Sequence, residues 1–107
     1  MIQVKYHRFY NKVTVEGHAG TAPKGEDLVC SAASILVHTL SANVGNMVKA
    51  GIAVNPVSDI RDGYAKISVR AVRGHENTVA SIFQAVAVGF EILEDKFPEY
   101  ISFKIIG

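Results

Sequence analysis

Two residues whose side chains could carry out nucleophilic catalysis lie close together in the sequence, His18 and Cys30. A thiolate is a strong nucleophile, and an adjacent imidazole generates it by removing the thiol proton. Eleven residues separate the two, and this interval contains a proline and two glycines, Gly20 and Gly25. We therefore interpret residues 17–34 as a candidate Cys–His site with a loop between its reactive groups.

The residues before Cys30 suggest how a helix would activate the thiol. Asp27 is expected to be the N-cap of a helix that begins at Leu28, because its carboxylate can accept a hydrogen bond from a first-turn amide. Cys30 would then lie in the first turn. There the helix dipole stabilises a thiolate by ~0.3–1 kcal/mol, and free amides can bind an oxyanion.

The glycines predict a mobile part of the site. Gly20 and Gly25 permit backbone angles that other residues avoid, so we expect the loop 19–26 to close over an extended peptide. Gly17, directly before His18, would let the substrate backbone approach closely. We also predict that His18 and Cys30 are too far apart to form a hydrogen bond when no substrate is bound.

These residues also have ordinary structural explanations. A lone cysteine in a helix is most often a small buried hydrophobe, and a histidine at a strand end is often a surface residue. Ser34, one turn after Cys30, would by default be a polar helix residue. A metal site is not expected, because His18 and Cys30 supply two ligands where zinc takes three or four. The remaining histidines are expected to be structural or solvated: His7, His38 and His75.

The periodicity of apolar residues predicts the elements that would position the pair. Alternation with period two indicates strands, and a stripe with period 3.6 indicates helices. Strands are expected at 2–9, 13–16, 52–57, 65–71 and 101–105, and helices at 28–50 and between Gly74 and Pro98. The order ββαββαβ predicts an α+β fold, a two-layer sandwich with a mostly antiparallel sheet and both helices packed on one face. The length of 107 residues predicts a single domain, 1–107.

Composition limits the partners and the compartment. The formal net charge is +1, and no two basic residues are adjacent, so a direct nucleic-acid contact is not expected. No apolar stretch approaches the ~20 residues of a membrane span, and no signal peptide is recognised. One cysteine excludes an intramolecular disulfide, and a free thiol suits the reducing cytoplasm.

The motif Gly17-His18-Ala19, followed by Asp27 and then by Cys30-Ser31-Ala32-Ala33-Ser34, resembles a known family. This pattern at this spacing is similar to the bacterial ribosomal-processing cysteine proteases, the Prp family. The chain length, the order of elements and the Asp-Gly turn before the fourth strand agree with it. The resemblance covers essentially the whole chain.

The resemblance implies a role for each matching residue. Cys30 would be the nucleophile, and His18 the general base and later the general acid. Asp27, Ser34 and Gly17 would support them, and the loop would move when substrate binds. Members of the family remove a short N-terminal extension from the precursor of the twenty-seventh protein of the bacterial large ribosomal subunit. They are cytoplasmic, use no cofactor and tend to be homodimers.

Two other functions stay open on the sequence. One is a non-catalytic, ribosome-associated binding module, which would bind the precursor without turning it over. The other is a thiol-redox protein, which is weaker because the chain has no second cysteine to resolve an oxidised thiol.

Overall fold

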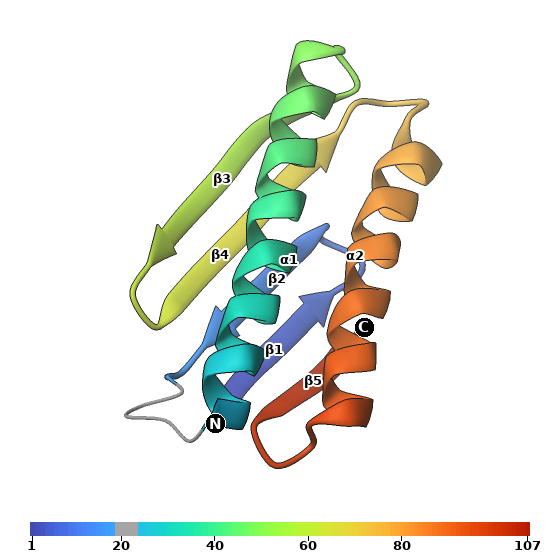
Figure 1. The fold of residues 1–107 in the computed structure, drawn as a ribbon. Helices are drawn as coiled ribbons and strands as arrows, with labels where there is room; N and C mark the ends of the chain where they lie inside the picture. Colours follow the sequence, from blue (N-terminus) through green and yellow to red (C-terminus); the bar gives the residue numbers. More distant parts are fainter. Residues whose placement is uncertain (19–23) are drawn as a thin grey trace.

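The structure is a computed structural model that describes residues 1–18 and 24–107, with the backbone alone for residues 24–27. Its elements are β1 (Ile2–His7), β2 (Lys12–Glu16), α1 (Lys24–Lys49), β3 (Ala53–Arg61), β4 (Tyr64–Ala71), α2 (Glu76–Lys96) and β5 (Ile101–Ile106). Both helices cover the same face of the sheet, and the other face is left open (Figure 1). The expected ββαββαβ two-layer sandwich is confirmed.

The sheet has the strand order β3-β4-β2-β1-β5. The pairs β3–β4, β4–β2 and β2–β1 are antiparallel, and β1–β5 is parallel. In the centre, Val4 lies opposite Val15 on one side and Phe103 on the other. Because side chains alternate between faces, this register places apolar residues beneath the helices and mostly polar ones on the open face, where Val54 and Val57 are exceptions. The expectation of a mostly antiparallel sheet is confirmed.

The core lies between the helices and the sheet. Burying each large apolar side chain contributes ~1.5–3 kcal/mol, so two long apolar stripes are enough to fix the helices in place. The two helices meet where Leu36 of α1 packs against Gly89 of α2. The fully or almost fully buried residues include Val4, Val13, Val29, Leu40, Val44, Ile67, Val79, Phe83, Phe90 and Ile101.

Helix α1 is more apolar than the sequence analysis expected. Its segment Leu28–Lys49 is long and apolar enough to cross a membrane by length and composition. In the fold, however, α1 buries its own residues Val29, Leu40 and Val44 in the core. A core helix of a sandwich passes the same test, and we assign α1 to that class.

The expected start of α1 is wrong. The helix begins at Lys24 rather than at Leu28, so Asp27 is its fourth residue and not its N-cap. The sequence is compatible with the earlier start, because Glu26 and Asp27 place negative charge where the helix dipole is positive. Pro23, directly before Lys24 in the sequence, is also a residue type favoured at helix starts.

This earlier start changes the surroundings of Cys30. Cys30 becomes the seventh helical residue and lies in the second turn. The dipole effect falls off within the first turn, and the amide of Cys30 belongs to the i→i−4 hydrogen-bond ladder. The expected thiolate stabilisation and oxyanion binding by first-turn amides therefore do not apply at Cys30. Gly25, expected in the loop, is the second residue of α1.

Strand β3 is longer than expected and lies at the edge of the sheet. It continues to Arg61 because its pairing with β4 shifts register between Val54 and Val57, around Pro56. Proline cannot donate to a ladder and is tolerated at edges and irregularities. The edge position of β3 is thus compatible with Pro56, whereas the expected end of the strand at Val57 is wrong.

Candidate active site

Cys30 lies on the face of α1 that turns toward the β3–β4 hairpin. The residue is half-buried and packs against the core. Ser34 and His38 follow at i+4 and i+8, which places them on the same ridge of the helix. All three line one groove, and this ridge forms its first wall.

The groove has a cavity volume of about 630 Å³. Its second wall is the end of the β3–β4 hairpin, residues 60–65, and its floor includes Ile2, Val15 and Val37. Grooves of this size with apolar floors and a few polar groups are typical ligand sites. The groove therefore has room for a ligand between a helix and a hairpin tip, with Cys30 on one side.

The segment that carries His18 is fixed by backbone contacts of Gly17. The amide of Gly17 donates a hydrogen bond to the carbonyl oxygen of Gly63 over 3.0 Å. Gly17 has φ +119°, and a Cβ there would collide with the carbonyl oxygen of Met1. Gly17 is therefore needed for this packing. Its expected role of admitting the substrate backbone stays a prediction.

The imidazole of His18 rests on the turn between β3 and β4. Its Nδ1 lies 3.9 Å from Oδ1 of Asp62, and the two side chains are 61% and 98% exposed. Such exposed pairs stabilise proteins little, so this contact contributes little to the stability of the fold. A Cβ at Gly63 would lie 2.5 Å from Nε2. The ring therefore occupies the space that a side chain at 63 would take.

Cys30 lines the groove from α1, whereas His18, which follows β2, is not among the lining residues. Gly17, the neighbour of His18, lines the groove together with Cys30. Within residues 1–18 and 28–107, no hydrogen bond joins the sulfur of Cys30 to the His18 ring, whose recorded polar contact is Asp62.

The remaining expected site residues divide into three groups. Ser34 is exposed on the groove wall beside Cys30. The backbone of Asp27 and Gly25 lies in the first turns of α1, and the side chain of Asp27 lies outside the described residues. Gly20 lies outside the described residues as well. In the part of the chain with described side chains, no three metal-ligating groups cluster.

Sequence reasoning missed that Asp62 and Gly63 lie beside His18. The sequence showed only a turn of the Asp-Gly type. Its proximity to His18 depends on β2 pairing with β4, in which Glu16 lies opposite Tyr64. That pairing joins segments almost fifty residues apart, and no local pattern reports it. His38 lies two turns from Cys30, about 12 Å along the helix, at the far end of the groove.

Comparison with known protein families shows to which family the chain belongs. The model of the family described as cysteine protease Prp matches residues 1–102. The chain belongs to the Prp family of cysteine proteases. It is therefore an enzyme, and the expected resemblance is confirmed.

Solved structures share the Prp fold of this chain. SMU.848 from Streptococcus mutans is 31% identical, with a TM-score of 0.64, over 99% of this chain and 94% of that chain. The ribosomal processing protease Prp from S. aureus with a covalently linked product peptide is 23% identical, with a TM-score of 0.71, over 98% and 99% of the two chains. The S. aureus protein with a substrate peptide is 20% identical, with a TM-score of 0.69, over 97% and 96%. A search of curated proteins finds no match.

Proposed function

We propose that this Prp-family protease removes a short N-terminal extension from the precursor of the twenty-seventh protein of the bacterial large ribosomal subunit. The observation that carries the proposal is one groove lined by both Cys30 and Gly17, the neighbour of His18. The similar S. aureus protein is a ribosomal processing protease that binds peptides, which supports the substrate class.

The proposed reaction follows from the two side chains. His18 removes the proton of the Cys30 thiol, and the thiolate attacks the carbonyl carbon of the scissile peptide bond. The tetrahedral intermediate collapses, the C–N bond breaks, and the imidazolium gives its proton to the leaving amine. The mature ribosomal protein departs, and the extension stays on Cys30 as a thioester. Water, deprotonated by His18, then hydrolyses the thioester and restores the free thiol.

Neighbouring residues have supporting roles in this proposal. The turn at Asp62 and Gly63 sets the starting orientation of the His18 ring. Hydroxyl groups of Ser31 and Ser34 lie on the groove wall beside Cys30, and we assign them the stabilisation of the oxyanion, because the amide of Cys30 is within the helix ladder. Asp27 is proposed to support the site from the start of α1.

We further propose that the enzyme works in the cytoplasm, without a cofactor, as a homodimer. A reducing compartment keeps the Cys30 thiol free. An exposed apolar strip on α2, Val88 and Ile92 one turn apart, supports association of two copies. Light scattering in solution measures this directly, and a mass of one chain at all concentrations would contradict the dimer.

The test is incubation of the precursor with the protein, with products weighed by mass spectrometry. Cys30→Ala and His18→Ala should lower the cleavage rate by at least about a thousandfold. His75→Ala is the matched control, since His75 is exposed at the start of α2, and it should cleave normally. Cleavage at the normal rate by Cys30→Ala would refute the proposal. Binding of the precursor without turnover by the intact protein would favour a binding module instead.

A further inference from the structure

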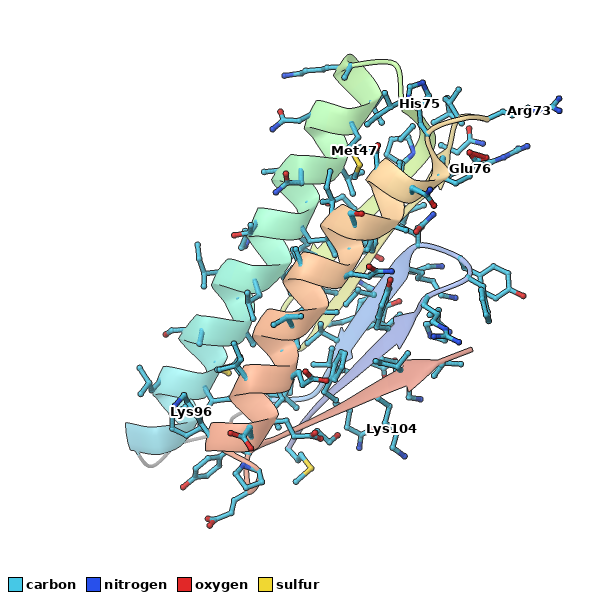
Figure 2. The ribbon with its side chains drawn as sticks, turned by 90° about the vertical axis from the view of Figure 1, so that its right-hand side faces the viewer. Met47, Arg73, His75, Glu76, Lys96 and Lys104 are labelled. Atoms are coloured by element: carbon cyan, nitrogen blue, oxygen red, sulfur yellow. The ribbon has the colours of Figure 1, made fainter. Side chains whose placement is uncertain are left out.

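The open face of the sheet, on the side without helices, gathers basic side chains from distant parts of the sequence. Residues paired across neighbouring strands share a face, so the registers define rows across it. The central row is Lys104, Lys5, Thr14, Lys66 and Asp59 from β5, β1, β2, β4 and β3 in turn. Figure 2 shows Lys104 on the side of the sheet remote from the helices.

The open face has a strong excess of positive charge. Its cations are Lys5, Lys12, Arg61, Lys66, Arg70 and Lys104, and its carboxylates are Glu16 and Asp59. Six cations less two carboxylates give +4 on this face. The whole chain has a net charge of +1, so all other residues together carry −3.

The carboxylate of Asp59 is already engaged. It accepts two hydrogen bonds from the Arg61 guanidinium, over 3.0 and 3.1 Å. Lys5 and Lys104 are exposed on adjacent strands, and their side chains line a hollow of about 250 Å³ together with Gln3, Val4 and Ser102. The lysines therefore border a shallow depression in which no carboxylate competes for them.

The positive charge of this face affects the pKa of a histidine that lies on it, His7. The pKa of His7 is held below its ordinary value, first by partial burial and then by the charges of Lys12 and Lys5. Both lysines disfavour a further positive charge at this place. An anion beside Lys12 and Lys5 would instead be attracted by their positive charges.

We propose that the open sheet face binds the phosphate backbone of RNA, without reading its bases. Strands lie about 4.8 Å apart, so Lys104 and Lys5 are one strand spacing apart and Lys66 follows two spacings further on, which lines up three cations across the sheet. A positively charged surface that follows the backbone is the basis of binding without sequence preference. Tyr64 offers little free surface for base stacking, because the Arg61 guanidinium lies over its ring at 4.7 Å.

Other occupants are less favoured. Two copies of this face brought together around a two-fold axis would oppose +4 with +4, which repels. The choice of RNA rather than DNA rests on the proposed function, since a ribosomal protein is a component of an RNA particle. The groove with Cys30 shares Arg61 and Tyr64 with the open face at the end of the β3–β4 hairpin, whereas Lys5 and Lys104 lie outside the groove, so RNA held by these lysines does not compete with the peptide. This inference reverses the expectation of no nucleic-acid contact.

The test is fluorescence anisotropy with a labelled, single-stranded RNA of about 20 uridines in about 50 mM salt. The double variant Lys5→Glu/Lys104→Glu should weaken binding at least about tenfold and reduce the salt dependence, whose slope falls by ~0.7 for each lost phosphate contact. The matched control is Lys49→Glu/Lys96→Glu. It changes the net charge equally at exposed positions on the helices, and it should weaken binding less than about twofold.

The inference is overturned if both double variants weaken binding equally, or if the wild type does not bind the RNA. Stronger binding to anionic phospholipid vesicles than to RNA in the same salt would also overturn it. Circular dichroism checks the fold, and Lys5→Gln/Lys104→Gln provides a milder variant that should show an intermediate loss. Cleavage of a short precursor peptide should be unchanged in Lys5→Glu/Lys104→Glu and in Lys5→Gln/Lys104→Gln. Loss of RNA binding is thus measured separately from failure of the proteolytic function.

Discussion

At the scale of single residues, the close contact between the His18 ring and Gly63 is the most specific feature of the site. The imidazole occupies the space next to Gly63, whose φ is +71°. A methyl group there must displace the ring. The orientation of the His18 ring thus depends on a glycine in a hairpin that is distant in sequence.

We predict that Gly63→Ala lowers kcat/KM for precursor cleavage by at least about tenfold, because misplaced catalytic groups lose rate steeply. Gly51→Ala is the control. Gly51 has a similar φ of +76° but open space around its Cβ position, so both variants pay a backbone penalty of roughly 1–2 kcal/mol. Urea unfolding measures that shared cost, and peptide cleavage measures the difference. Equal activity of the two variants would contradict the claim that the contact with Gly63 positions the His18 ring.

A second residue-scale prediction concerns Tyr6 in the core. Its hydroxyl is buried without a hydrogen-bond partner among the described residues, and burial raises the pKa of Tyr6 while the charge of Arg8 partly lowers it. The stability contributed by the protonated form is thus present below the unfolded pKa and is lost as pH rises through the higher folded pKa. Tyr6→Phe should increase the free energy of unfolding by up to ~1 kcal/mol at pH 7.

The pH dependence of the same variant checks its cause. Above a pH of about 10, the wild type should lose stability more steeply than Tyr6→Phe, because the variant has no hydroxyl to ionise. Urea denaturation at neutral and alkaline pH gives both values. A parallel fall of the two curves would show that Tyr6 is not the titrating group.

Residue types and spacing made His18 and Cys30 candidates, the resemblance to the family gave them catalytic roles, and those roles stay predictions. Asp62 and Gly63 could not be identified in this way, since a turn has no feature that reports which strand pairs beside it. The prediction that Asp27 is the N-cap of α1 was wrong for another reason. Acidic residues suit both the cap and the first turn, and the sequence does not distinguish them.

At the scale of elements, the two glycines inside the helices have different surroundings. Gly45 of α1 has nothing within 4 Å of its Cβ position, whereas a Cβ at Gly89 of α2 would lie 2.6 Å from Cδ2 of Leu36. Gly89 therefore allows the helices to approach each other. Gly45 has no such contact.

We predict that Gly45→Ala raises the free energy of unfolding by up to ~1 kcal/mol, the difference in helix propensity. Gly89→Ala gains the same propensity but overpacks the helix contact, which costs ~1–3 kcal/mol. It should therefore be less stable than Gly45→Ala by about that amount. Thermal unfolding of the two variants side by side checks this, and equal gains would show that the helices are not in close contact.

Element order and strand faces were predictable, because period two and period 3.6 persist through long segments such as β4 and α2. The start of α1 was harder to place, because the apolar stripe begins only at Leu28 while the helix continues toward Lys24 through polar residues. The extent of β3 was missed because Pro56 suggests a strand end, whereas the strand passes it through an irregular register. Lysines from different strands gather on one face because of the strand order. The alternation of apolar and polar residues along each strand does not predict that order.

At the scale of the whole molecule, the two sides of the sheet have separate chemistry. The helix side holds the groove with Cys30, and the open side holds the basic rows. Carboxylates concentrate instead on the helix side, at the end of α2 and after it: Glu91, Glu94, Asp95 and Glu99. One of them, Glu94, accepts a hydrogen bond from the amide of Phe103 over 2.7 Å and joins α2 to β5. The molecule thus separates peptide chemistry from the proposed RNA contact.

The central claim is that Cys30 attacks the precursor and carries its extension as a thioester. Acid quenching during turnover, followed by intact-protein mass spectrometry, tests it most directly. We expect a fraction of the enzyme to gain the mass of the N-terminal fragment less one water, with fragmentation placing the added mass on Cys30 and no such species in Cys30→Ala. Cleavage of the precursor with Cys30 unmodified throughout, and at the same rate in Cys30→Ala, would contradict the claim.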